Sequence, residues 1–310
     1  MKIVFAGTPD FATEHLKMVI GSHHEISCVL TQPDRKSGRG KKVKFSPVKE
    51  LALHKNIPVF QPANLREEDT LNVLKKLEPD LVLVVAYGLL IPKNILDIPK
   101  YGCINVHASI LPKWRGASPM EYCLLNGDKK SGISYMQMSE GLDEGPVFQI
   151  HECGIEIQDN LRTLEEKLIG LSEKNLCEFL NLIESESIEA KNQNDNEVSF
   201  APKITKEMLQ IDWAEDAKKI ISKINAFYSK YGAYFLLGDK RIKIHKAKEY
   251  KQDQNLKPGH IESTDDGMII FCRAGSAILI EDIQMEGKNI VSGQEFISAY
   301  KDIIEDNKLI

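Results

Sequence analysis

Residues 80–86 read DLVLVVA, and this stretch decides the fold class. Side chains of a β-strand alternate between two faces, and from Leu81 to Val85 both faces are apolar. A strand that is apolar on both faces lies in the middle of a covered sheet, which is typical of parallel α/β sheets. The stretch therefore predicts a central strand with helices on either side of its sheet.

Similar short apolar runs recur through the first half of the chain and alternate with helical patterns. This alternation predicts an α/β fold, here a Rossmann-like, mostly parallel sheet. The other expected strands are residues 2–7, 25–30, 57–60 and 102–107. After the first strand we expect Thr8 to cap a helix that ends at Gly21. That turn has one glycine, Gly7, where a dinucleotide fingerprint needs three, which argues against NAD binding there.

The next part of the chain predicts an edge to this sheet. The runs ISYMQM (133–138) and PVFQIHECGIEI (146–157) lie close together in sequence, so we expect an antiparallel pair of strands at one sheet edge. Thr163 and Glu166 predict a capping box at the start of a long helix. We expect a catalytic domain over residues 1–190 and a polar linker over 191–206.

Residues 207–310 predict a second, mainly β domain. One helical pattern over 214–227 precedes five strand-like runs separated by turn residues. Five short strands in about a hundred residues are typical of a small OB-like β-barrel. The expected strands are 233–237, 240–247, 259–263, 267–273 and 276–285.

Charge and composition narrow the classes of protein. A net charge of -5 over 310 residues argues against a protein that coats nucleic acid without selectivity. The stretch RKSGRGKKVK (35–44) nevertheless contains no acid, and this basic loop predicts a directed contact with a polyanion. The six cysteines are dispersed and no apolar run reaches the roughly 18 residues of a membrane span, so we expect a cytoplasmic protein without a structural metal.

Two polar residues interrupt the expected strand 102–107. Asn105 and His107 are two positions apart, so they point to the same side at the carboxyl end of the strand, where open α/β sheets bind ligands. A carboxylate from the turn EGLDEG (140–145) would orient the imidazole, and Asp143 is the best candidate, although spacing alone does not exclude Glu140 or Glu144. With no serine or cysteine nucleophile in an elbow, the set suits acyl transfer in which the substrate supplies its own nucleophile.

Three motifs together carry a family resemblance. NVHASILPKWRGASP (105–119), LLNGD (124–128) and MQMSEGLDEGPV (136–147) resemble the folate-dependent formyltransferases. FAGTPDFA (5–12), TQPDRKSGRGKKVKFSPVK (31–49) and VVAYGLLIP (84–92) are similar to the members that act on methionyl-tRNA. The resemblance covers nearly the whole chain.

The resemblance implies transfer of the formyl group of 10-formyltetrahydrofolate to the free amino group of methionyl-initiator tRNA, for translation initiation. We expect the protein to be a monomer and to use no metal. Asn105 and protonated His107 would hold the oxyanion, and Asp143 would stabilise the imidazolium. The S-x-L-P turn and the apolar turn 87–90 would hold the folate, with the Leu111–Pro112 isomer left open. The residues implied in binding are Ser109, Ile110, Leu111 and Pro112 for folate and Arg39, Lys41 and Lys42 for tRNA.

Two departures and three alternatives accompany this interpretation. The chain has YSKYG (228–232) where the family usually has a turn with Pro and Trp, and Tyr135 stands where a smaller aliphatic residue is common. An aminosugar nucleotide or glycinamide ribonucleotide is an alternative formyl acceptor. The third alternative is a non-enzymatic RNA-binding module, against which the convergent polar set argues.

Overall fold

The chain folds into two compact units. The structure is a computed structural model that describes residues 1–37, 42–252, 254, 256–301 and 304, without the side chains of residues 36, 37 and 42. The first unit comprises residues 1–119, 130–154 and 165–202. The second comprises residues 120–129 and 155–164 and the chain from Lys203 onward. No helix in the described part of the chain is both long and apolar enough to cross a membrane.

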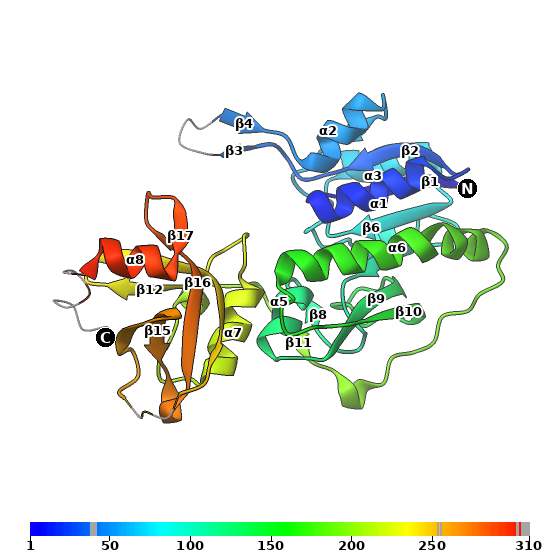
Figure 1. Ribbon diagram of the computed structural model, residues 1–310. Coiled ribbons are helices and arrows are strands. Elements are labelled where there is room, and N and C mark those ends of the chain that lie inside the picture. The colour runs from blue at the N-terminus through cyan, green and yellow to red at the C-terminus, as the bar shows by residue number, and fades with distance from the viewer. Residues whose placement is uncertain (38–41, 253, 255, 302–303, 305–310) are drawn as a thin grey trace. The chain divides into compact units, whose positions relative to one another are not determined.

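A seven-stranded sheet forms the centre of the first unit (Figure 1). Its strands are β1 (Lys2–Gly7), β2 (Glu25–Leu30), β5 (Val59–Phe60), β6 (Leu81–Val85), β7 (Cys103–His107), β9 (Lys130–Gln137) and β10 (Val147–Gly154). The order is β10-β9-β7-β6-β1-β2-β5, with the five strands from β7 to β5 parallel and β9 and β10 antiparallel at the edge. The predicted parallel sheet and its antiparallel edge are both confirmed.

Helices cover both faces of this sheet, as the alternating pattern predicted. On one face the apolar side chains of α3 and α4 pack against Val4 and Val82. On the other face α1 and α6 lie side by side (Figure 1), and His15 Nε2 is 2.7 Å from Ser172 Oγ between them. The helices that begin in this unit or connect it are α1 (Asp10–Ile20), α2 (Pro47–His54), α3 (Glu68–Leu77), α4 (Lys93–Leu96), α5 (Pro119–Leu125) and α6 (Leu161–Glu184).

Both predicted helix caps need correction. Thr8 does not cap α1, because its hydroxyl donates to the carbonyl oxygen of Tyr87 at 3.0 Å and so ties the ends of β1 and β6 together. Helix α6 begins at Leu161, two residues before Thr163, and Asn160 Oδ1 accepts from the backbone N–H of Thr163 at 3.2 Å. Thr163 Oγ1 accepts in return from the N–H of Asn160 at 2.9 Å, so Thr163 occupies the far side of the box rather than its cap.

Two stretches expected to be irregular contain short strands. The two ends of the basic stretch pair as β3 (Arg35–Ser37) and β4 (Lys42–Lys44). In the stretch expected to be a linker, a 3-10 turn, η1 (Asp195–Glu197), leads to β11 (Phe200–Ala201), which pairs in parallel with β8 (Arg115–Gly116). The chain before the second unit is therefore packed against the loop that follows β7.

The second unit contains a six-stranded antiparallel sheet, which confirms the predicted OB-like class as a curled half-barrel. Its expected elements are observed as α7 (Ala217–Ala226), β12 (Tyr234–Leu237), β13 (Lys240–Tyr250), β14 (Ile261–Thr264), β15 (Gly267–Phe271) and β16 (Ala277–Met285). The elements that the sequence analysis did not predict are β17 (Ile290–Ser292), α8 (Gly293–Ala299), η2 (Glu207–Leu209) and η3 (Arg273–Gly275). Strand β13 is rich in basic residues, and two of them, Lys246 and Lys248, pair with Glu281 at 3.0 and 3.2 Å.

Candidate active site

The candidate site begins on β7, the last parallel strand. Register places Asn105 opposite Met136 and His107 opposite Ser134 on β9, while Val106 lies opposite Tyr135. Asn105 and His107 therefore share one face of the sheet, as the period of two predicted. Cys103 lies on the same face, and burial raises the pKa of its thiol to about 12, so it remains a protonated apolar side chain.

Asp143 reaches this face from the loop between β9 and β10. Its carboxylate lies 3.4 Å from Asn105 Nδ2 and 3.7 Å from His107 Nδ1, and it accepts from the backbone N–H of Gly116 at 2.8 Å. Glu140 and Glu144, the alternatives from the same turn, are both exposed. The structure thus brings together the three residues that the sequence analysis selected.

The imidazole of His107 is buried between two acceptors. Nδ1 faces the carboxylate of Asp143, and Nε2 lies 3.0 Å from the main-chain oxygen of Trp114. A proton on either ring nitrogen of His107 would therefore face an acceptor.

Two donors in the site keep unused hydrogen-bonding capacity. The Asn105 amide is at the long limit of a hydrogen bond to Asp143, and His107 Nδ1 is beyond that limit. Both point toward the same carboxylate, which Gly116 holds at a normal distance. Donors that are this loosely engaged remain able to donate to an oxygen atom of a ligand.

The S-x-L-P turn directly after β7 is rigidly held. Ser134 Oγ accepts from Leu111 N at 3.1 Å and donates to Ser109 O at 2.7 Å, while Ser109 Oγ donates to Lys113 O at 2.6 Å. The Leu111–Pro112 peptide is cis. Ser109 and Leu111 are buried, and Ile110 and Pro112 are partly exposed beside them.

The apolar turn after β6 is fixed at its backbone and open at its tip. Gln32 Nε2 donates to the carbonyl oxygens of Tyr87 and Gly88 at 3.2 and 3.0 Å. Tyr87 is buried, whereas Leu90 is 77% exposed. An exposed leucine of this size on a fixed turn is available to contact an apolar part of a ligand.

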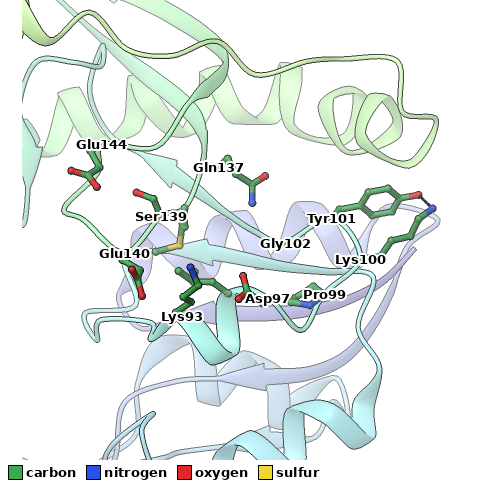
Figure 2. A pocket seen from close by; sticks show the side chains of 12 residues that line it. Lys93, Asp97, Pro99, Lys100, Tyr101, Gly102, Gln137, Ser139, Glu140 and Glu144 are labelled. Atoms are coloured by element: carbon green, nitrogen blue, oxygen red, sulfur yellow. Dashed lines mark hydrogen bonds between the residues drawn. The ribbon is translucent and has the colours of Figure 1, made fainter.

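A cavity of about 720 Å³ opens beside the loop that carries Asp143 (Figure 2). Its lining includes Lys93, Tyr101 and Ser139, together with both exposed acids of the loop, Glu140 and Glu144. Among the described residues, the lining does not include Asn105, His107 or Asp143. The candidate catalytic residues therefore do not form this cavity, whose walls include Tyr101 and Gly102 just before β7.

The structure shows where Tyr135, one of the two departures from the family pattern, lies relative to the candidate site. Tyr135 is fully buried on the opposite face of β9, where it stacks on Phe179 with ring centroids 4.4 Å apart, so it does not narrow the candidate site. Arg39 and Lys41 lie outside the described residues, and Lys42 begins β4 with its side chain also outside them.

Three groups in the site were missed by the sequence analysis. Two are main-chain groups, the carbonyl of Trp114 and the N–H of Gly116, and the third is the side chain of Gln193. A main-chain group leaves no residue-type signal, although Gly116 has φ of +127° and no room for a Cβ, which would meet Ala201 O at 2.6 Å. Gln193 lies in a polar stretch without periodicity, so no pattern in the sequence marked it.

Comparison with known proteins places this geometry in a family. A sequence profile described as Formyl transferase matches residues 1–180, and one described as Formyl transferase, C-terminal domain, matches residues 203–301. The chain belongs to the formyl transferase family. A curated relative from Legionella pneumophila strain Philadelphia 1, named Methionyl-tRNA formyltransferase, is 41% identical over 301 residues, which cover 97% of this chain and 96% of the relative.

Solved structures show the same fold at lower identity. The sugar 3N-formyl transferase WlaRD, solved in the presence of dTDP and 5-N-formyl-THF, matches with a TM-score of 0.68 at 19% identity, covering 93% of this chain and 99% of that one. Methionyl-tRNA formyltransferase from Clostridium thermocellum matches with a TM-score of 0.59 at 17% identity, covering 94% and 100%.

Proposed function

We propose that the chain transfers the formyl group of 10-formyltetrahydrofolate to the amino group of methionyl-initiator tRNA. The observation that carries this proposal is the convergence of Asn105, His107 and Asp143 on one face at the end of β7. A relative with the corresponding name, 41% identical over 97% of the chain, supports the acceptor. The membership of the formyl transferase family supports a folate donor.

In the proposed reaction the neutral amine of the methionyl ester attacks the formyl carbon. The carbonyl oxygen becomes negative, and Asn105 Nδ2 and His107 Nδ1 donate to it, because neither is committed to a short hydrogen bond beforehand. The bond between the formyl carbon and N10 of the folate then breaks. The proton lost by the amine goes to N10, and tetrahydrofolate leaves.

Asp143 has two tasks in this scheme. Its negative charge stabilises the imidazolium of His107, and a water between the carboxylate and the amine would relay the departing proton. Its fixed position costs little reorganisation during the reaction, since the N–H of Gly116 already holds one carboxylate oxygen at 2.8 Å. His107 in turn is held by the carbonyl oxygen of Trp114.

We place the folate against the rigid turn formed by Ser109, Ile110, Leu111 and Pro112. Support comes from the turn's position directly after His107 and from its two buried serine hydrogen bonds. The pterin would contact the apolar turn 87–90, whose Leu90 is exposed. We place the acceptor end of the tRNA against Arg39, Lys41 and Lys42, where binding through phosphates would weaken steeply with salt.

The experiment that tests this proposal is a formylation assay with alternative amines. Purified protein and 10-formyltetrahydrofolate are offered initiator methionyl-tRNA, elongator methionyl-tRNA, glycinamide ribonucleotide and an aminosugar nucleotide in parallel. We expect formyl transfer to initiator methionyl-tRNA to exceed transfer to the other three by at least tenfold. Preferential formylation of either small amine would contradict the proposed acceptor and leave the chemistry of the site standing.

A further inference from the structure

The side chain of Gln193 holds the loop that carries Asp143. Its Nε2 donates to the main-chain oxygen of Asp143 at 2.8 Å and to that of Gly145 at 2.7 Å. Its Oε1 accepts from Nε and Nη2 of Arg115 at 3.1 and 2.9 Å. Both ends of this one amide are therefore engaged, which fixes its rotamer and its orientation.

The loop needs such support because its backbone is unusual. Asp143 has φ of +49°, a left-handed conformation that residues with side chains adopt at a cost. Gly145 leaves no space for a Cβ, which would lie 1.9 Å from Gln137 O. A strained loop keeps one conformation only when surrounding contacts determine it, and the two bonds from Gln193 hold its main chain at Asp143 and at Gly145.

Arg115 closes these contacts into a ring. Its guanidinium is buried and donates to Gln193, while the N–H of the next residue, Gly116, donates to the carboxylate of Asp143 at 2.8 Å. The carboxylate of Asp195 also lies 3.5 Å from Arg115 Nη2, but Asp195 is 90% exposed, so screening makes this contact weaker than the one with Gln193. Asp143 is thus held at its carboxylate and at its carbonyl by groups that meet at Arg115.

We infer that Gln193 and Arg115 are positioning residues for formyl transfer, which set the place of the Asp143 carboxylate relative to His107. This inference rests on the proposed function. Gln193 bonds to main-chain atoms of the loop and to Arg115, and it acts on the reaction through Asp143. Since Gln193 precedes the second unit by only ten residues, the stretch expected to be a linker also has a part in the catalytic site.

Gln193→Leu and Gln193→Glu test the inference. Leucine keeps the approximate size and removes all four hydrogen bonds, whereas glutamate keeps the acceptors for Arg115 and loses the donors to Asp143 O and Gly145 O. We expect kcat to fall by about 10- to 100-fold in both, as for a misplaced catalytic group, with KM for tRNA and folate changed less than threefold. Asn192→Ala, an exposed neighbour, is the matched control and should keep the wild-type kcat.

Hydrogen exchange separates positioning from simple loss of stability. In folded Gln193→Leu the N–H of Gly116, which donates to Asp143, should exchange faster, while amides in β6 keep their wild-type rates. A wild-type kcat per folded molecule in Gln193→Leu, or unchanged exchange at Gly116, would overturn the inference. If the wild-type protein formylates no methionyl-tRNA, the proposed function is contradicted. That result is distinct from a failure of the inference about Gln193, which is judged by hydrogen exchange at Gly116.

Discussion

Asp143→Asn removes one negative charge from the candidate site while keeping the size of the side chain. The carboxylate lies 3.7 Å from His107 Nδ1, and both side chains are largely buried. At this separation, with an effective dielectric constant of about 20, the attraction between a carboxylate and an imidazolium is about 4 kcal/mol. If the transition state relies on the charged imidazole, the rate of transfer should fall by up to about a thousandfold.

Single-turnover formylation measures this effect without interference from product release. Enzyme in excess over methionyl-tRNA is mixed with saturating 10-formyltetrahydrofolate, and formylmethionine is quantified over time. Glu152→Gln serves as the control because it removes a carboxylate from the surface of β10, where the side chain is 45% exposed. The control should retain the wild-type rate, while Asp143→Asn should bind tRNA and folate normally.

A double-mutant cycle with His107→Ala tests whether the two residues act together. Groups that act as a unit give strongly non-additive losses, so the double variant should be little slower than His107→Ala alone. Additive losses would refute the coupling between Asp143 and His107. A fall of less than threefold in Asp143→Asn would refute the electrostatic role of the carboxylate.

Three further predictions concern His107 in the candidate site, Arg39 in the basic stretch and His15 in the core. His107→Ala should lose most formyl transfer and keep tRNA and folate binding within about twofold, as measured by turnover and by equilibrium binding. Arg39→Ala should weaken the use of tRNA more than the use of folate, so an unchanged apparent tRNA affinity contradicts its assignment. Burial lowers the pKa of His15 to about 4, so the folded protein keeps this side chain neutral. The unfolded chain binds a proton at His15 below about pH 6.5, so the free energy of unfolding is highest above pH 6.5 and decreases as the pH falls toward 4. The wild type should lose about 3 kcal/mol of unfolding free energy over that range relative to His15→Gln, by urea denaturation.

The sequence predicted the parts of the fold that depend on periodicity. The doubly apolar run at 81–85 became the central strand β6, and the spacing of Asn105 and His107 placed both on one face of β7. Choosing Asp143 over its neighbours needed the family resemblance, because position in the chain does not reveal which turn residue bends back. The structure shows the physical difference, since Asp143 is the one bonded to Gly116.

Competing hydrogen bonds explain the wrong cap predictions. Thr8 fits the preference for a helix cap, but its hydroxyl finds a carbonyl on a neighbouring strand end, which sequence proximity cannot show. At α6 the side chain of Asn160 can cap a helix as well as that of Thr163 can, and Asn160 occupies the N-cap position. The helix α8 carries a clear signal, Ser292 and Glu295 in a reciprocal box, which the sequence analysis did not use.

The role of Gln193 had no signal in the sequence. A polar residue in an aperiodic stretch is usually solvated, but the bridge between Lys191 and Val147 and the pairing of β11 with β8 bring this one to the catalytic loop. The support of the candidate site is therefore non-local: its residues come from β7, from residues 114–116 after it, from the loop between β9 and β10, and from the stretch that follows α6.

The central claim is that Asn105, His107 and Asp143 transfer a formyl group to methionyl-tRNA. The most direct measurement follows a labelled formyl carbon from 10-formyltetrahydrofolate in a single turnover, with amino acids released from the tRNA afterwards. We predict label in N-formylmethionine with the wild type and about a thousandfold less with His107→Ala. Label absent from methionine in the wild type, or present equally in both proteins, would contradict the account.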